Sequence, residues 1–318
     1  MSGDITTRTV KTNGIDMHVT EAGKGKPVIL CHGFPELAYS WRHQMPALAA
    51  AGYHAIAPDQ RGYGRTTRTE PVGDYDIVHL TDDIVGLLDA LEIDKAVVVG
   101  HDWGSIVAWG LAQHAPERVS AVVGMSVPFT PRGAMSIIDL LKAVMGDNFF
   151  YILYFQEPGK ADADLGGNAR EVMRRFLGTG SIGGGTGMTT SLPAATTTIL
   201  DWLPPVEKLP DWLTEEDLDI FATEFERTGF TGGINWYRNM HRNWEITEHL
   251  AEAKIEMPAL FVAGTDDPVL QLANPDAMDG WVTDLRGKVL IPGAGHWVQQ
   301  EKPAEVNRAL LAFLASLE

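Results

Sequence analysis

The sequence contains a single cysteine, Cys31, among its 318 residues, so disulfide bonds cannot contribute to the fold. This cysteine lies in the apolar run 27–31, where we expect a small buried side chain and not a nucleophile. Basic residues are also scarce. The 25 Lys and Arg residues are outnumbered by 42 Asp and Glu residues, and the net charge of −17 repels phosphate backbones and anionic lipids. We therefore expect neither nucleic acid nor membrane partners.

Long hydrophobic runs are absent as well. No apolar stretch approaches the roughly 20 residues that a membrane-spanning helix requires, and no basic and apolar leader opens the chain. These absences predict a cytoplasmic protein. With 45% apolar residues, the chain can still build a well-packed globular core.

The first third of the sequence alternates short strands with helices. The turn at Asn13-Gly14 predicts an antiparallel pair of strands on either side of it. Strands are expected at 5–11, 17–21, 28–31, 54–57, 96–99 and 119–125, and helices at 41–51, 80–91 and 105–114. Because strands that alternate with helices form parallel sheets, we predict a mainly parallel central sheet covered by helices on both faces.

The strand pattern stops from about residue 131 to residue 244, where aromatic residues and helix formers dominate. It resumes with strands at 259–263 and 288–291 and a terminal helix at 303–317. The pattern thus predicts a core in two parts, 1–130 and 245–318, interrupted by an all-helical cap at 131–244. Six of the ten residues from 178 to 187 are glycines, and a Ser/Thr/Pro-rich stretch follows, so a mobile loop is expected there.

The segment Gly100-His101-Asp102-Trp103-Gly104 joins a predicted strand to a predicted helix. Its flanking glycines permit the tight turn that exposes the central side chain, which in hydrolases of this design is usually serine. A serine that attacked a saturated carbon would form a stable ether, whereas an aspartate forms an ester that water can cleave. Asp102 therefore favours displacement at a saturated carbon of an epoxide or a haloalkane. A simple helix N-cap is the alternative interpretation of this aspartate.

A base and an orienting acid are needed to cleave such an ester, in the chain order nucleophile, acid, histidine. His296 follows the last predicted strand within Gly293-Ala294-Gly295-His296-Trp297, where a base is expected. Asp266 and Asp267 follow the strand before it, and we choose Asp267 as the partner of His296. The alternatives are an ordinary surface histidine and a turn capped by aspartates.

The motif His32-Gly33-Phe34-Pro35-Glu36 follows the strand that ends at Cys31. The backbone N–H groups of Phe34 and Trp103 are expected to form an oxyanion hole for the ester. A cis peptide bond is expected before Pro35. An ordinary Gly-Pro loop is the alternative.

An opened epoxide leaves an alkoxide that must be protonated, and tyrosine is a suitable donor near neutral pH. The helical insertion offers Tyr154 in "LYFQEPG" and Tyr237 in "NWYRNM". Each could instead be a core aromatic residue.

Together, these motifs resemble the α/β-hydrolase-fold epoxide hydrolases, and the resemblance extends over essentially the whole chain. The matching segments are 32–36, 100–105, 154–159, 235–240 and 295–297. The resemblance implies that Asp102 is the nucleophile, His296 the base that activates water and Asp267 its partner. It also implies that Tyr154 and Tyr237 bind and protonate the epoxide oxygen, while Phe34 and Trp103 form the oxyanion hole. These last four residues would also contact the substrate.

We therefore predict an enzyme that needs no cofactor or metal and converts a small apolar epoxide to a vicinal diol between core and cap. A homodimer is left open. A haloalkane dehalogenase is one rival, although residues 34–36 offer no obvious second halide donor. The other rival is a binding protein that kept this fold and lost turnover, which need not have retained nucleophile, base and acid together.

Overall fold

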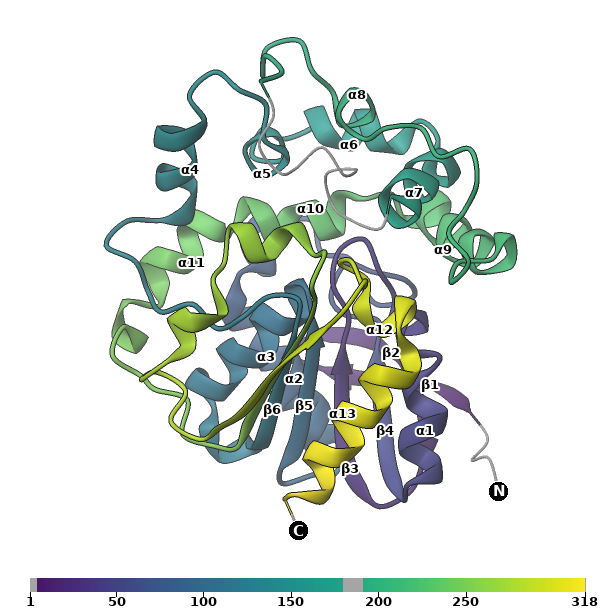
Figure 1. Cartoon of the computed structure of the whole chain (residues 1–318), viewed down its shortest axis with the longest axis vertical. Coiled ribbons are helices and arrows are strands. Elements are labelled where there is room, and N and C mark those ends of the chain that lie inside the picture. Colours follow the sequence, from purple (N-terminus) through teal and green to yellow (C-terminus); the bar gives the residue numbers. More distant parts are fainter. Residues whose placement is uncertain (1–4, 180–190, 318) are drawn as a thin grey trace.

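The computed structural model describes residues 5–179 and 191–317. An eight-stranded sheet in the order β1-β2-β4-β3-β5-β6-β7-β8 forms its centre (Figure 1). The strands are β1 (Thr6–Thr12), β2 (Ile15–Gly23), β3 (Lys26–Cys31), β4 (Tyr53–Pro58), β5 (Ala96–His101), β6 (Val119–Met125), β7 (Ala259–Gly264) and β8 (Leu285–Ile291). The β1–β2 and β2–β4 pairs are antiparallel, and every other pair is parallel. The predicted α/β-hydrolase fold, with its mainly parallel sheet, is confirmed.

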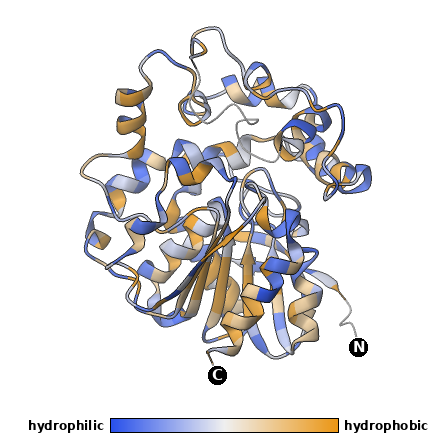
Figure 2. Ribbon diagram, viewed as in Figure 1, coloured by the Kyte–Doolittle hydropathy of each residue, from blue (hydrophilic) through white to orange (hydrophobic). Residues whose placement is uncertain are grey.

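Helices cover both faces of the sheet, and the strands supply apolar side chains to each face. Along β3, Val28 and Leu30 belong to one buried cluster, whereas Ile29 and Cys31 belong to the other, as the two-residue period of a strand requires. All six residues of β5 are buried, and the strands are coloured mainly hydrophobic in Figure 2. Burial raises the pKa of Cys31 to about 12, which keeps its thiol protonated.

The helices of the core are α1 (Gln44–Ala50), α2 (Ile77–Ala90), α3 (Trp103–His114), α12 (Val298–Glu301) and α13 (Pro303–Ala315). The predicted helix at 41–51 is instead a 3₁₀ turn, Ala38–Trp41, followed by α1. Pro46 accounts for the late start of α1, because a residue without an N–H is tolerated only in the first turn of a helix. The predicted Asn13-Gly14 turn is confirmed, with φ angles of 42° and 77°.

Eight helices are inserted between β6 and β7 in the described part of the chain, and they lie over one end of the sheet (Figure 1). They are α4 (Ile137–Met145), α5 (Tyr151–Tyr154), α6 (Lys160–Gly166), α7 (Ala169–Gly178), α8 (Ile199–Trp202), α9 (Glu215–Thr228), α10 (Thr231–Arg238) and α11 (Met240–Ile246). Gly178 ends α7, while residues 180–190 of the predicted mobile loop lie outside the described residues. No helix in the described ranges is long and apolar enough to cross a membrane.

Helix α10 is held closely against the core. A Cβ atom on Gly232 would collide with the carbonyl oxygen of Gly62, so the two backbones meet without side chains between them. One turn later, Trp236 donates from Nε1 to the carbonyl oxygen of Arg61 at 3.1 Å. This inserted helix therefore has a fixed position relative to the sheet.

The register of the parallel strands determines where the loops begin. Cys31 of β3 pairs with Gly100 of β5, and His101 pairs with Met125 of β6. The loops that follow these strands consequently start at the same level, at the carboxyl edge of the sheet where α/β proteins bind their ligands.

Candidate active site

Asp102 lies in a strained turn between β5 and α3, with φ 52° and ψ −118°. The turn requires small neighbours. A Cβ on Gly100 would collide with the carbonyl oxygen of Gly104, and one on Gly104 with that of Cys31. The Asp102 side chain makes no capping hydrogen bond to α3. The carboxylate is therefore presented by the backbone of the turn and is not engaged in closing the helix.

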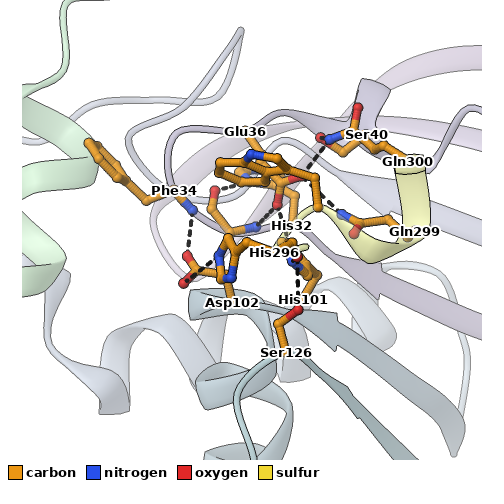
Figure 3. A network of polar contacts seen from close by, with 12 residues as sticks. His32, Phe34, Glu36, Ser40, His101, Asp102, Ser126, His296, Gln299 and Gln300 are labelled. Carbon is orange, nitrogen blue, oxygen red and sulfur yellow. Dashed lines mark hydrogen bonds and ion pairs between the residues drawn. The ribbon is translucent and has the colours of Figure 1, made fainter. Parts of the chain in front are cut away.

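The two oxygens of Asp102 face different groups (Figure 3). The Phe34 N–H donates to Oδ1 at 2.9 Å, and His296 Nε2 lies 3.5 Å from Oδ2. A Cβ on Gly33 would stand 2.6 Å from Oδ1, so the loop after β3 can approach the carboxylate only with glycine there. The Phe34–Pro35 peptide bond is cis, as expected.

His296 and Asp267 are both buried and lie in contact. His296 Nδ1 is 3.1 Å from Asp267 Oδ1 and 3.0 Å from Oδ2. Burial alone would lower the pKa of His296, but the charges and hydrogen bonds of Asp267 and Asp102 outweigh it and raise that pKa well above 6.5. Burial would raise the pKa of Asp267, yet His296 holds it below its usual value. Asp266, the alternative acid, is exposed.

A second set of polar contacts holds the loop of His296 in place (Figure 3). His101 Nε2 donates to the carbonyl oxygen of His296 at 2.7 Å, and Ser126 Oγ donates to the same oxygen at 2.8 Å. His101 Nδ1 lies 2.6 Å from Glu36 Oε2. Sequence reasoning assigned no role to these residues, although a carboxyl group inside the apolar stretch 34–38 was a signal that it is buried with a partner.

Glu36 is completely buried and accepts several hydrogen bonds. The Gly33 N–H donates to Oε2 at 2.8 Å, and the amides of Gln299 and Gln300 each donate to Oε1 at 3.0 Å. Burial would raise the pKa of Glu36, but the charge and hydrogen bond of His101, followed by the Gly33 N–H and the charge of His32, lower it to about 2. Glu36 thus connects the loop after β3, the turn of Asp102 and helix α12.

Replacing Glu36 by Gln tests this role. We expect Glu36→Gln to lower the free energy of unfolding by about 2 to 3 kcal/mol at pH 7. The NH₂ group of the new glutamine would face buried N–H groups that now bind the carboxylate. The pKa of Glu36 falls from 4.5 to about 2 on folding, so its contribution is complete above pH 4.5 and is lost as the pH falls toward 2. Urea denaturation between pH 7 and pH 3 should show the deficit narrowing below about pH 4.5. Glu226→Gln, at an exposed position, is the control. If the stability lost in Glu36→Gln grew larger in acid, the role given to the Glu36 carboxylate would be wrong.

Tyr237 lies on α10 beside the turn of Asp102. Its ring centroid is 5.0 Å from that of Trp103 and 5.3 Å from that of Phe34. The side chain is buried, and its hydroxyl has no hydrogen-bond partner of ordinary geometry within the described residues. Burial, followed by the neighbouring Tyr151 and the charge of Asp102, raises the pKa of Tyr237 well above 10.

Tyr154 is not brought to this group, which corrects its predicted placement. Its hydroxyl donates to Asp164 at 3.3 Å, and Lys160 Nζ stands 4.9 Å from its ring centroid. Burial and the charge of Asp164 raise the pKa of Tyr154 to about 12. The ring lines a pocket of about 200 Å³, together with Phe149 and Glu157. Its hydroxyl therefore serves a contact within the inserted helices.

Tyr151, three residues earlier on α5, takes the expected position beside Tyr237. The two ring centroids are 5.8 Å apart, and the ring of Tyr151 also stacks on that of Trp202, with centroids 5.3 Å apart and an interplanar angle of 14°. Burial first, and then the charge of Asp102, raises the pKa of Tyr151. Asp102 therefore acts electrostatically on both of these phenols, whereas Tyr154 responds to Asp164.

The rest of the site is aromatic, and it holds no evident metal centre. Within 5–179 and 191–317, no group of three or more His, Cys, Asp and Glu side chains is arranged to hold a metal ion. The buried rings around Asp102 and the two phenols include Phe34, Trp103, Phe155, Trp202 and Trp236.

The chain is similar to known epoxide hydrolases over its full length. Residues 26–163 match the family described as alpha/beta hydrolase fold. Epoxide hydrolase A of Mycobacterium tuberculosis is 51% identical over 99% of both chains, and epoxide hydrolase 1 of Siraitia grosvenorii is 41% identical over 96% of this chain and 97% of its own. The crystal structure of epoxide hydrolase A from Mycobacterium thermoresistibile superposes with a TM-score of 0.95 at 52% identity, covering 99% of each chain. The structure of potato epoxide hydrolase I superposes with a TM-score of 0.90 at 36% identity, covering 98% of this chain and 100% of the potato chain.

Proposed function

Since the chain belongs to the α/β-hydrolase-fold epoxide hydrolases, we propose that it opens its substrate through a covalent ester on Asp102. One observation carries this mechanism. The Asp102 carboxylate stands between the Phe34 N–H and His296, on a strained turn, without capping the helix that follows. A carboxylate held in this way has one oxygen stabilised by a donor and one available for attack.

In the first step, Asp102 Oδ2 attacks one carbon of the epoxide and the C–O bond of the ring breaks. The electron pair stays on the epoxide oxygen, to which Tyr151 and Tyr237 donate hydrogen bonds, and one phenol transfers its proton to that oxygen. The product is an ester whose carbonyl oxygen is Oδ1, held by the Phe34 N–H. The N–H of Trp103 is the second donor that we propose for this oxygen.

In the second step, His296 removes a proton from water, and the hydroxide attacks the acyl carbon of Asp102. The acyl C–O bond breaks, the diol oxygen takes the proton from His296, and Asp102 regains its carboxylate. The proton of the added hydroxyl returns to the phenolate, so the balance is epoxide plus water to diol. Asp267 stabilises the imidazolium while it exists.

The charge of Asp102 couples the two steps. Before reaction it supports the raised pKa values of His296, Tyr151 and Tyr237. Esterification removes this charge, so the phenols become better acids as the alkoxide forms, and His296 releases its proton more readily and can then act as a base. Formation of the ester thus prepares the two phenols to protonate the alkoxide and His296 to activate water.

A single turnover in ¹⁸O-labelled water tests the ester directly. With less epoxide than protein, the new oxygen of the diol should come from unlabelled Asp102, and one ¹⁸O should appear in that side chain after the ester is cleaved. Mass spectrometry of the diol and of the peptide containing Asp102 measures both. A diol labelled in its first turnover, with an unlabelled peptide, would mean that water attacks the epoxide directly.

Further proposals concern the substrate and its setting. The aromatic surroundings of Asp102 support a small apolar epoxide, bound between the core and the inserted helices. We retain 131–244 as the cap domain, and a cytoplasmic setting, for which the lone buried thiol of Cys31 is the support. A homodimer is a proposal that sedimentation would test.

A further inference from the structure

The two phenols that face the epoxide oxygen come from different short helices, α5 and α10. Helix α5 has only four residues, which is too short to hold its own geometry in water. Helix α10 is fixed on the core by Gly232 and Trp236. The position of Tyr151 relative to Tyr237 therefore depends on tertiary contacts, among them those that join these two helices directly.

Gln156 makes one such contact with its side-chain amide. Its Nε2 donates to the carbonyl oxygen of Ile152 at 2.8 Å and to that of Tyr237 at 3.0 Å. The Ile152 carbonyl belongs to the single turn of α5, and the Tyr237 carbonyl belongs to the last turn of α10. One planar amide thus connects the residue after Tyr151 with Tyr237 itself.

Arg238 makes the reciprocal contact. It donates from Nε to the carbonyl oxygen of Phe155 at 3.0 Å and from Nη2 to that of Glu157 at 3.2 Å. Its guanidinium is also paired with Asp162 at 2.5 Å, and the side chain as a whole is mostly buried. Gln156 and Arg238 therefore each bind the carbonyl of the residue that precedes the other, and we call this pair of contacts the Gln156–Arg238 bridge.

We propose that the Gln156–Arg238 bridge positions Tyr151 against Tyr237, and that it serves the opening of the epoxide but not the hydrolysis of the ester. The inference rests on the roles proposed above for the two phenols. The groups that hydrolyse the ester, Asp102, Asp267 and His296, follow β5, β7 and β8, and none of them contacts the bridge. Loss of the bridge should thus affect the two half-reactions unequally.

Gln156→Met removes both amide donors and keeps the length of the side chain. We expect the rate of ester formation in a single turnover to fall about tenfold, because small displacements of a reacting group have effects of this size. The rate of ester hydrolysis should stay within about twofold, since its groups lie in the core. Rapid quenching followed by intact-protein mass spectrometry measures both rates.

Gln113→Met is the matched control. Gln113 is also half-buried, and its amide donates to the carbonyl oxygen of Ala253 at 2.6 Å, on the core side of the molecule. This variant loses a contact of the same kind and should form and hydrolyse the ester at wild-type rates. Arg238→Lys, which keeps a cation opposite Asp162 but loses the planar Nε donor, gives a second measurement and decides the question if Gln156→Met does not fold.

Two outcomes would overturn the positioning role proposed for the Gln156–Arg238 bridge. Unchanged ester formation in Gln156→Met and Arg238→Lys shows that the contacts do not position the phenols, and an equal loss in both half-reactions shows a general loosening of the structure. Tyr151→Phe and Tyr237→Phe are measured in parallel. If these two variants also form the ester at the wild-type rate, the proposed roles of the phenols fail. If they are slow and the bridge variants are not, only the bridge is wrong.

Discussion

A protein carrying His296→Gln will consume one epoxide per molecule and then stop as a stable ester on Asp102. Glutamine cannot remove a proton from water, while the nucleophile, the Phe34 N–H and both phenols remain in place. Steady-state turnover should fall by about 10³ to 10⁴, which is the range for loss of a general base. Intact-protein mass spectrometry should show an added mass equal to that of the epoxide, and peptide mapping should place it on Asp102.

Asp102→Asn is the control for this experiment, because its amide cannot form the ester and no added mass should appear. If the His296→Gln protein lost turnover without gaining mass, His296 would be needed for ester formation. That result would contradict the proposed sequence of events. Added mass that disappears at the wild-type rate would show that another group activates the water.

The second large effect is expected from the pair Tyr151→Phe and Tyr237→Phe. Loss of both phenols removes the only proposed proton donors to the epoxide oxygen, so kcat/KM should fall by about 10³, within the range for general acid catalysis. Each single variant should lose less, because one phenol remains. The rate of ester formation under single-turnover conditions measures the effect on the chemical step itself.

Tyr154→Phe is the matched control in the same helix. It removes only the hydroxyl that donates to Asp164, and its kcat/KM should stay within about threefold of the wild-type value. A large loss in Tyr154→Phe, with full activity in Tyr151→Phe, would return the role of proton donor to Tyr154.

Much of the fold could be predicted because the strands are marked by local chemistry. β5 contains three consecutive valines, Val97–Val99, and the strand predicted at 119–125 has the bounds of β6. The glycines around Asp102 likewise indicated the turn, because only a tight strand-to-helix connection requires them on both sides. Strands and tight turns depend on residues that are close together in the sequence, so they can be predicted from it.

The choice between Tyr151 and Tyr154 is of another kind. The two residues are three positions apart and share one side of a short helix, so periodicity does not separate them. Tertiary partners decide the matter: Trp202 stacks on Tyr151, and Asp164 binds Tyr154. One signal was available, because Tyr151 follows two phenylalanines while Tyr154 precedes a charged stretch at 157–164.

The contact between Glu36 and His101 was missed for a similar reason. The two residues are 65 positions apart in the chain, and only the pairing of β3 with β5 brings them together. A lone acid or histidine in a loop is compatible with many roles. The partner of such a residue can be identified only when the order of the strands is known.

The pairing of Cys31 with Gly100 has a consequence for how proteins of this kind diversify. It makes the distance between Phe34 and Asp102 a property of the strand ladder, in which the smallest possible slip is one residue, or about 3.3 Å. Such a slip is larger than any hydrogen bond tolerates, so a change of strand register cannot adjust the contact between Phe34 and Asp102 in small steps. The inserted helices are not bound to this strand ladder, so their lengths and contacts can change by small steps.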